Sequence, residues 1–154
     1  REILPMAPDD STARNGLYDI AHLCENHKEM RARLPGVARE LEAVNLRMGE
    51  LGQAAQSAAD VADALDRLGN LNEARAEYLR ALAQYPKSGW LRLRHARFLK
   101  RHGDPARAME AYRAVIPLDE DETADLARQE LRELEQEGAA ERQSHAHSPE
   151  RSGS

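Results

Sequence analysis

Residues 55–88 read AQSAADVADALDRLGNLNEARAEYLRALAQYPKS, and residues 89–122 read GWLRLRHARFLKRHGDPARAMEAYRAVIPLDEDE. Placed one above the other, the two stretches carry the same residue at six positions. The matching pairs are Ala62 with Ala96, Leu65 with Leu99, Arg67 with Arg101, Gly69 with Gly103, Ala74 with Ala108, and Tyr78 with Tyr112. Because the matches lie at helical spacings on both sides of a shared glycine, the sequence predicts a helix–turn–helix unit of 34 residues that occurs twice.

This unit resembles the tetratricopeptide repeat (TPR), which also has 34 residues and two helices. In the first unit the resemblance is carried by Ala62, Leu65, Gly69, Ala74, Tyr78, Ala81 and Pro86. The second unit keeps Ala96, Leu99, Gly103, Ala108 and Tyr112, but it departs from the family at Val115 and Glu120. The resemblance implies an all-α fold, a right-handed solenoid of about seven antiparallel helices.

The composition of the chain agrees with a helical protein. It contains 26 Ala and 19 Leu, whereas Val, Ile and Thr together number only 9, which argues against an all-β or α/β fold. Charged residues of both signs make up 32% and the net charge is −5, which is typical of a solvated helical surface. No apolar run approaches the roughly 20 residues that span a bilayer, so we expect no membrane contact by this segment.

The domain organisation follows from the repeats, because two repeats alone are too few to bury a continuous core. We expect a linker at 1–11, a TPR-like helical domain at 12–137 and a disordered tail at 138–154. The domain is divided into a divergent N-terminal hairpin at 12–54, repeats at 55–88 and 89–122, and a capping helix at 123–137. An acidic run from Asp119 to Glu122 lies next to the N-terminus of this last helix.

Several helix boundaries can be predicted inside and next to the divergent hairpin. Ser11 or Thr12 is expected to cap a helix that continues to about Leu34, before Pro35–Gly36 interrupts the chain. The apolar stripe Val37–Leu51 predicts the second helix of this hairpin. Ser57 with Asp60 suggests a capping-box variant near the start of the first repeat, and Asp104 with Pro105 a strong start for the second helix of the next one.

The residue types used in catalysis and metal binding do not form a convincing site. His145 and His147 lie two positions apart in the predicted tail, and so do His22 and Cys24 on a helix, where ligands would need a spacing of three or four. Cys24 is the single cysteine and is expected to be simply buried, and His95 to be a partly buried, hydrogen-bonded side chain. We therefore predict no catalytic residue, no metal and no cofactor.

The charges are unevenly distributed along the repeats. Seven basic residues and no acid lie between Tyr78 and Gly103, whereas eleven acids and four arginines lie between Asp104 and Glu137. The TPR resemblance implies that the first helix of each repeat lines a concave binding groove. In this register the groove residues that we expect to bind a partner are Trp90, Leu93, Arg94, Arg97, Arg101 and Asp63. Arginine can bind a carboxylate with two hydrogen bonds, and tryptophan is a frequent interface anchor.

These observations predict a non-catalytic protein-interaction scaffold that binds an acidic or C-terminal segment of a protein or peptide partner. A clamp of the kind found in chaperone-binding TPRs is not expected, because Asp63 and Ala59 stand where the resemblance implies Asn and Lys. Three alternatives remain open. The basic run is only a solvated face, or its residues pair with the acidic final helix of the same or a neighbouring chain, or the chain self-associates through the Val37–Leu51 stripe or the exposed end of the solenoid. Nucleic acid is not an expected partner, and the expected location is the cytoplasm or the soluble part of a larger, membrane-anchored protein.

Overall fold

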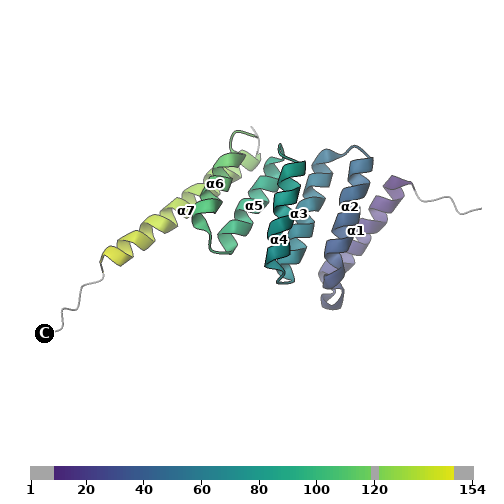
Figure 1. Cartoon of the computed structure of the whole chain (residues 1–154), viewed down its shortest axis with the longest axis horizontal. Coiled ribbons are helices and arrows are strands. Elements are labelled where there is room, and N and C mark those ends of the chain that lie inside the picture. The colour runs from purple at the N-terminus through teal and green to yellow at the C-terminus, as the bar shows by residue number, and fades with distance from the viewer. Residues whose placement is uncertain (1–8, 119–121, 148–154) are drawn as a thin grey trace, which may run out of the picture. The chain divides into compact units, whose positions relative to one another are not determined.

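A computed structural model describes residues 9–118 and 122–147 of the chain (Figure 1). Within these residues there are seven α-helices, one 3-10 helix and no strand, which confirms the predicted all-α helical-repeat fold. The elements are α1 Asp10–Asn26, η1 Lys28–Arg33, α2 Leu34–Arg47, α3 Leu51–Arg67, α4 Leu71–Gln84, α5 Gly89–Arg101, α6 Pro105–Val115 and α7 Glu122–Ala146. They divide into two compact units, the first ending at Leu91 and the second beginning at Arg92.

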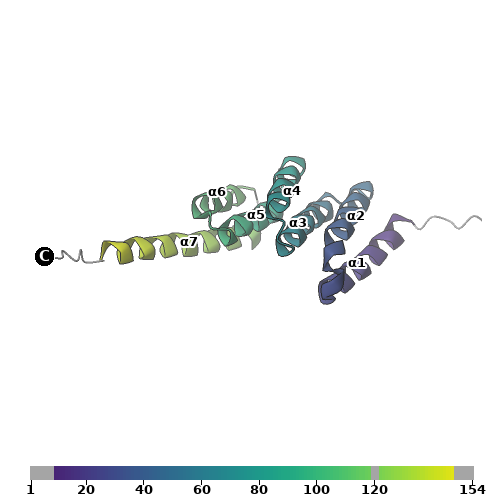
Figure 2. The same cartoon turned by 60° about the horizontal axis from the view of Figure 1, so that its bottom comes forward.

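In the first unit, α1 to α4 lie side by side in chain order (Figure 2). Helix α2 packs against both α1 and α3, and α3 packs against α4. The contact is close because α3 buries mainly small side chains, among them Ala58, Ala62 and Ala64. Tyr78 of α4 and Ala74 are also completely buried, as expected for large and small residues that alternate in a core.

The turns between helices depend on glycines with a positive φ. Gly69 and Gly103 have φ angles of 82° and 75°, a region that residues with a Cβ rarely adopt. At the first of these turns, the N–H of Asn70 donates to the carbonyl of Leu65 over 3.0 Å, so the last turn of α3 is closed by backbone hydrogen bonds. The glycine shared by the two repeats therefore ends the first helix of each hairpin.

The second unit contains α6 and α7, which pack against each other. Helix α6 begins as predicted: Asp104 is the cap and accepts a hydrogen bond of 3.2 Å from the N–H of Arg107, and Pro105 occupies the first turn. Its buried side chains are Ala108, Tyr112 and Val115, and those of α7 are Ala124, Ala127, Leu131 and Leu134.

The predicted first helix of the divergent hairpin is wrong at both ends. Asp9 caps α1, since its carboxylate accepts the N–H of Thr12 at 2.8 Å, so neither Ser11 nor Thr12 is the cap. Helix α1 ends at Asn26, and the 3-10 helix η1 follows it. Pro35 does not interrupt a helix but lies in the first turn of α2, where the missing N–H of proline costs no hydrogen bond.

Three further predictions need correction. Helix α2 ends at Arg47, so Leu51 begins α3 instead of ending α2. Ser57 does not cap a helix but is buried inside α3, where its hydroxyl accepts a 3.2 Å hydrogen bond from Asn45. Helix α7 continues beyond position 137 to Ala146, because the strong helix formers around Gly138 outweigh one glycine. Residues 1–8 of the predicted linker, the acids 119–121 and residues 148–154 of the predicted tail lie outside the described residues.

Candidate functional site

The predicted partner-binding residues of the second repeat all belong to α5. Trp90, Arg94, Arg97 and Arg101 follow one another at steps of four, three and four, which places them on one face of the helix. Arg101 is exposed, and the other three side chains are half-buried. Leu93 is completely buried, so its prediction as a partner contact is wrong. It is a core residue, because a side chain so fully covered has no surface left for a partner.

Arg97 holds a carboxylate from its own chain. Its Nε lies 3.0 Å from Oε1 and 3.1 Å from Oε2 of Glu130 in α7, and its Nη2 donates to Oε1 as well. The hydroxyl of Tyr112 donates to Oε2 of the same carboxylate over 2.8 Å. Burial alone would raise the pKa of Glu130, but the hydrogen bonds from Arg97 and Tyr112 outweigh it, so the pKa lies below its usual value. Glu130 is therefore ionised at neutral pH.

In the first repeat, Asp63 accepts the hydrogen bond from the tyrosine that Glu130 accepts in the second. It stands 34 positions before Arg97, just as Tyr78 stands 34 positions before Tyr112. The hydroxyl of Tyr78 donates directly to the carboxylate of Asp63. In the first repeat this position is Asp63, and Tyr78 donates to it directly. In the second repeat the position is Arg97, and Glu130 of α7 provides the carboxylate that accepts from both Arg97 and Tyr112. Asp63 thus has a structural hydrogen bond within the first unit.

The pairing of basic residues with the acidic final helix, left open by the sequence, occurs in the second unit. Besides Arg97 with Glu130, Lys100 lies 3.6 Å from Glu137 and belongs to the same helix α5. The side chain of Arg97 still has 35% of its surface exposed. The basic face of α5 is therefore partly occupied by carboxylates of α7 and partly accessible.

A buried ionic cluster in the first unit was missed by the sequence analysis. The carboxylates of Glu42 in α2 and Glu77 in α4 are both buried, and Nη2 of Arg80 lies 2.7 Å from the first and 2.6 Å from the second. Tyr85 donates to Glu42 over 2.7 Å, and Arg39 donates to Glu77 over 3.0 Å. The spacing of three between Glu77 and Arg80 is typical of an ion pair on one helix. Glu42 lies 38 positions before Arg80, so the sequence gives no signal that the two residues are in contact.

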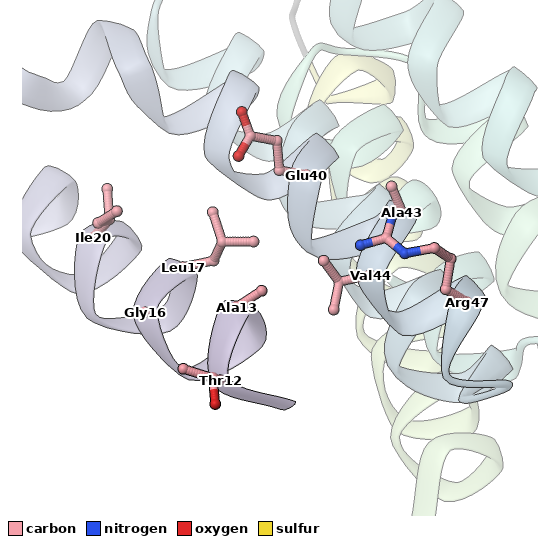
Figure 3. Close-up of a pocket in the computed structure, with 9 residues that line it drawn as sticks. All are labelled: Thr12, Ala13, Gly16, Leu17, Ile20, Glu40, Ala43, Val44 and Arg47. Atoms are coloured by element: carbon pink, nitrogen blue, oxygen red, sulfur yellow. The ribbon is translucent and has the colours of Figure 1, made fainter. Parts of the chain in front are cut away.

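The apolar stripe predicted to mediate self-association is used inside the first unit. Val37, Leu41 and Val44 are buried, whereas Leu51 is largely exposed. Most of the stripe therefore packs against α1 and α3 inside the first unit. Next to it, a mainly apolar groove of about 470 Å³ lies between α1 and α2, and Leu17 and Val44 point into it (Figure 3).

The two other candidates for chemistry, Cys24 and His95, are both withdrawn from the surface to some degree. Cys24 is completely buried against Leu34, Val37 and Ala64, as expected. His95 is half-buried, and burial, with a contribution from Arg92, lowers its pKa to about 4. Among the described residues, no three His, Cys, Asp or Glu side chains gather in a way that could hold a metal ion. None of the described helices is both long and apolar enough to cross a bilayer.

Comparison with known proteins places part of the chain in a family. Residues 55–98 match the tetratricopeptide repeat, a stretch that covers the whole of the first predicted repeat and most of α5. No curated protein and no solved structure matched the chain. Repeats of this family generally mediate protein–protein interaction and are typically non-catalytic. The helical hairpin of this stretch and its turn glycine agree with the match, so residues 55–98 are similar to the tetratricopeptide repeat.

Proposed function

We propose that the chain is a non-catalytic scaffold that binds an acidic segment of a partner protein through the basic face of α5. This face is formed by Trp90, Arg94, Arg97 and Arg101. Two further cations, Arg92 and Lys100, lie on the same helix, which contains no acid. The positive potential of such a helix would attract and orient an acidic partner.

The observation that carries the proposal is the way Arg97 binds Glu130. Both Nε and Nη2 of the guanidinium contact the carboxylate, which is the strongest geometry available to an arginine–carboxylate pair. Because Arg97 remains about one-third exposed, a carboxylate from a partner can share or replace Glu130 on it. The partner's apolar side chains would then lie beside the indole of Trp90, one helical turn before Arg94.

A defined probe tests this proposal. We suggest the amidated peptide Gly-Glu-Glu-Leu-Glu-Glu-Gly, here called the acidic probe, labelled with fluorescein and titrated with the full chain by fluorescence anisotropy. Arg94→Gln combined with Arg101→Gln should weaken binding by about tenfold and reduce its dependence on salt. Arg107→Gln combined with Arg128→Gln removes the same charge from exposed pairs elsewhere in the second unit and should leave affinity unchanged.

The outcomes are distinct. Equal affinity of the wild type and the α5 variant for the acidic probe, read from the NMR amide shifts of α5 itself, would contradict the proposal. Equal binding of a probe with Gln in place of Glu would show that charge is not what is recognised. Repeating the titration with a free C-terminal carboxylate in place of the amide tests whether a chain terminus is preferred, which would appear as tighter binding of that form.

A further inference from the structure

A second basic site lies in the first unit, where α1 turns into α2. The 3-10 helix η1 makes this connection in place of the glycine turn found in both repeats. Beside it is a pocket of about 360 Å³. Its lining residues are Glu25, Arg31, Leu34, Ala64, Arg67 and Leu68. They come from the end of α1, from η1, from the start of α2 and from the end of α3.

The floor of this pocket is apolar. Leu34 and Ala64 are buried members of the cluster around Cys24, and each presents only a small part of its surface. Leu68 is 38% exposed. An apolar side chain placed on Leu34 and Leu68 would remove this exposed surface from water.

The rim of the pocket is basic. Arg31 and Arg67 are exposed, and neither forms an ion pair with a described residue. Other arginines of the same unit do have carboxylate partners: Arg14 lies 2.8 Å from Glu50, and Arg47 lies 2.8 Å from Asp10. An arginine pair beside an apolar floor has the chemistry that recognises a carboxylate next to an apolar residue.

The positive charge extends beyond the pocket along η1. This helix carries Lys28 and Arg33 in addition to Arg31, and its one acid, Glu29, lies 3.9 Å from His27. Glu25 is the one carboxylate on the rim. A ligand with several negative charges therefore fits this surface better than a single small anion does.

We propose that this pocket binds an acidic segment of a partner protein in which an apolar side chain is flanked by carboxylates. The apolar side chain lies on Leu34 and Leu68, and the carboxylates on either side bind Arg31 and Arg67. The site shares no residue with the basic face of α5 and does not depend on it. The site combines Arg31 of η1, from the hairpin that departs from the repeat pattern, with Arg67 and Leu68 of the first repeat.

The experiment uses the acidic probe with the full chain and follows each amide by NMR, so that the two basic sites report separately. Addition of the probe should shift the amide signals of Leu34, Ala64 and Leu68. Arg31→Gln combined with Arg67→Gln should abolish these shifts, or weaken the affinity derived from them by about tenfold. Arg75→Gln combined with Arg132→Gln is the matched control, since both residues are exposed and have no ion pair within the described chain.

Two further variants separate binding from folding. Glu25→Gln removes the one negative charge on the rim and should strengthen binding by about twofold. Leu68→Ser should weaken binding of the acidic probe while leaving the circular dichroism spectrum unchanged, because Leu68 is partly exposed. A probe with Ala in place of Leu should bind the wild type more weakly.

The results that would overturn the proposal are equally specific. Shifts at Leu34, Ala64 and Leu68 that survive in the Arg31 and Arg67 double variant would exclude the arginine pair as the binding group. The same shifts produced by inorganic phosphate or by acetate at the same concentration would show an anion site with no preference for a peptide. Shifts that depend on protein concentration without any probe would indicate that a second copy of the chain occupies the pocket.

Discussion

Replacing Arg80 by methionine should strongly destabilise the first unit. Arg80 is the one group that contacts both buried carboxylates, with distances of 2.7 Å to Glu42 and 2.6 Å to Glu77. After the substitution, Glu42 keeps only the hydroxyl of Tyr85, and Glu77 keeps only Arg39. Two buried like charges then face each other without the cation between them, although methionine preserves most of the side-chain volume.

The magnitude follows from burial. Removing one partner of a fully buried ion pair costs about 3–5 kcal/mol, because the remaining charge stays desolvated. The side chain of Arg80 is 37% exposed, so solvent screens part of the interaction and we expect about 2–3 kcal/mol. Arg39→Met is the matched control: its side chain is 52% exposed and makes one ion pair, so it should cost about 0.5–1 kcal/mol.

Urea unfolding at pH 7, followed by circular dichroism, measures both variants. The dependence on pH adds a second test. Burial would raise the pKa of Glu77, but hydrogen bonds from Arg80 and Arg39 hold it below its ordinary value of 4.5. The stabilisation from this carboxylate is therefore present above about pH 4.5 and is lost as the pH falls through the lower pKa of the folded state. The difference between wild type and Arg80→Met should shrink over that range.

The opposite results are easily recognised. If Arg80→Met and Arg39→Met destabilise the protein equally, Arg80 does not bridge the two carboxylates. If Glu42→Gln does not recover part of the stability lost in Arg80→Met, the loss has another origin, such as the packing of the arginine stem.

Three other predictions can be tested on the same protein. Ala108→Leu should overpack the buried face of α6 and cost about 1–3 kcal/mol, whereas Ala76→Leu at an exposed position should cost almost nothing. Equal melting temperatures of the two variants would contradict the repeat register. His95 should show no imidazole titration by NMR between pH 5.5 and 8, because its pKa is about 4. Since burial disfavours the charged imidazole, the contribution of neutral His95 to stability is present above about pH 6.5 and is lost as the pH falls towards 4. Deleting residues 138–154 should reduce helicity measured by circular dichroism, since α7 reaches Ala146, but leave the melting temperature unchanged, because nearly all described side chains there are exposed.

Most helix ends depend on more than the local sequence. Asp104 followed by Pro105 was a correct start signal, because both act on the first turn of the same helix. Asp9, Ser11 and Thr12 are all good caps, and only the folded chain decides between them. The sequence predicts that the last helix ends at position 137, before Gly138, but a single glycine costs about 1 kcal/mol, which its neighbours in α7 compensate.

The sequence by itself determined the repeat and its core. Gly69 and Gly103, the buried alanines and the two tyrosines could all be assigned, because helical spacing and a positive φ are properties of neighbouring residues. It also identified the basic stretch and its candidate carboxylate partners. It could not assign Glu130 to Arg97, because the two residues lie 33 positions apart, and it gave no indication that Glu42, 38 positions away, binds Arg80.

Only the tertiary structure decided which charged side chains are structural and which remain for a partner. Arg97 and Arg67 both lie in the first helix of a repeat, yet α7 supplies a carboxylate to the first, and no described residue supplies one to the second. The sequence likewise could not reveal that η1 brings Arg31 to the pocket lined by Arg67. Ion pairing requires charged atoms within about 4 Å, and the packing of distant helices, not their local sequence, brings atoms that close.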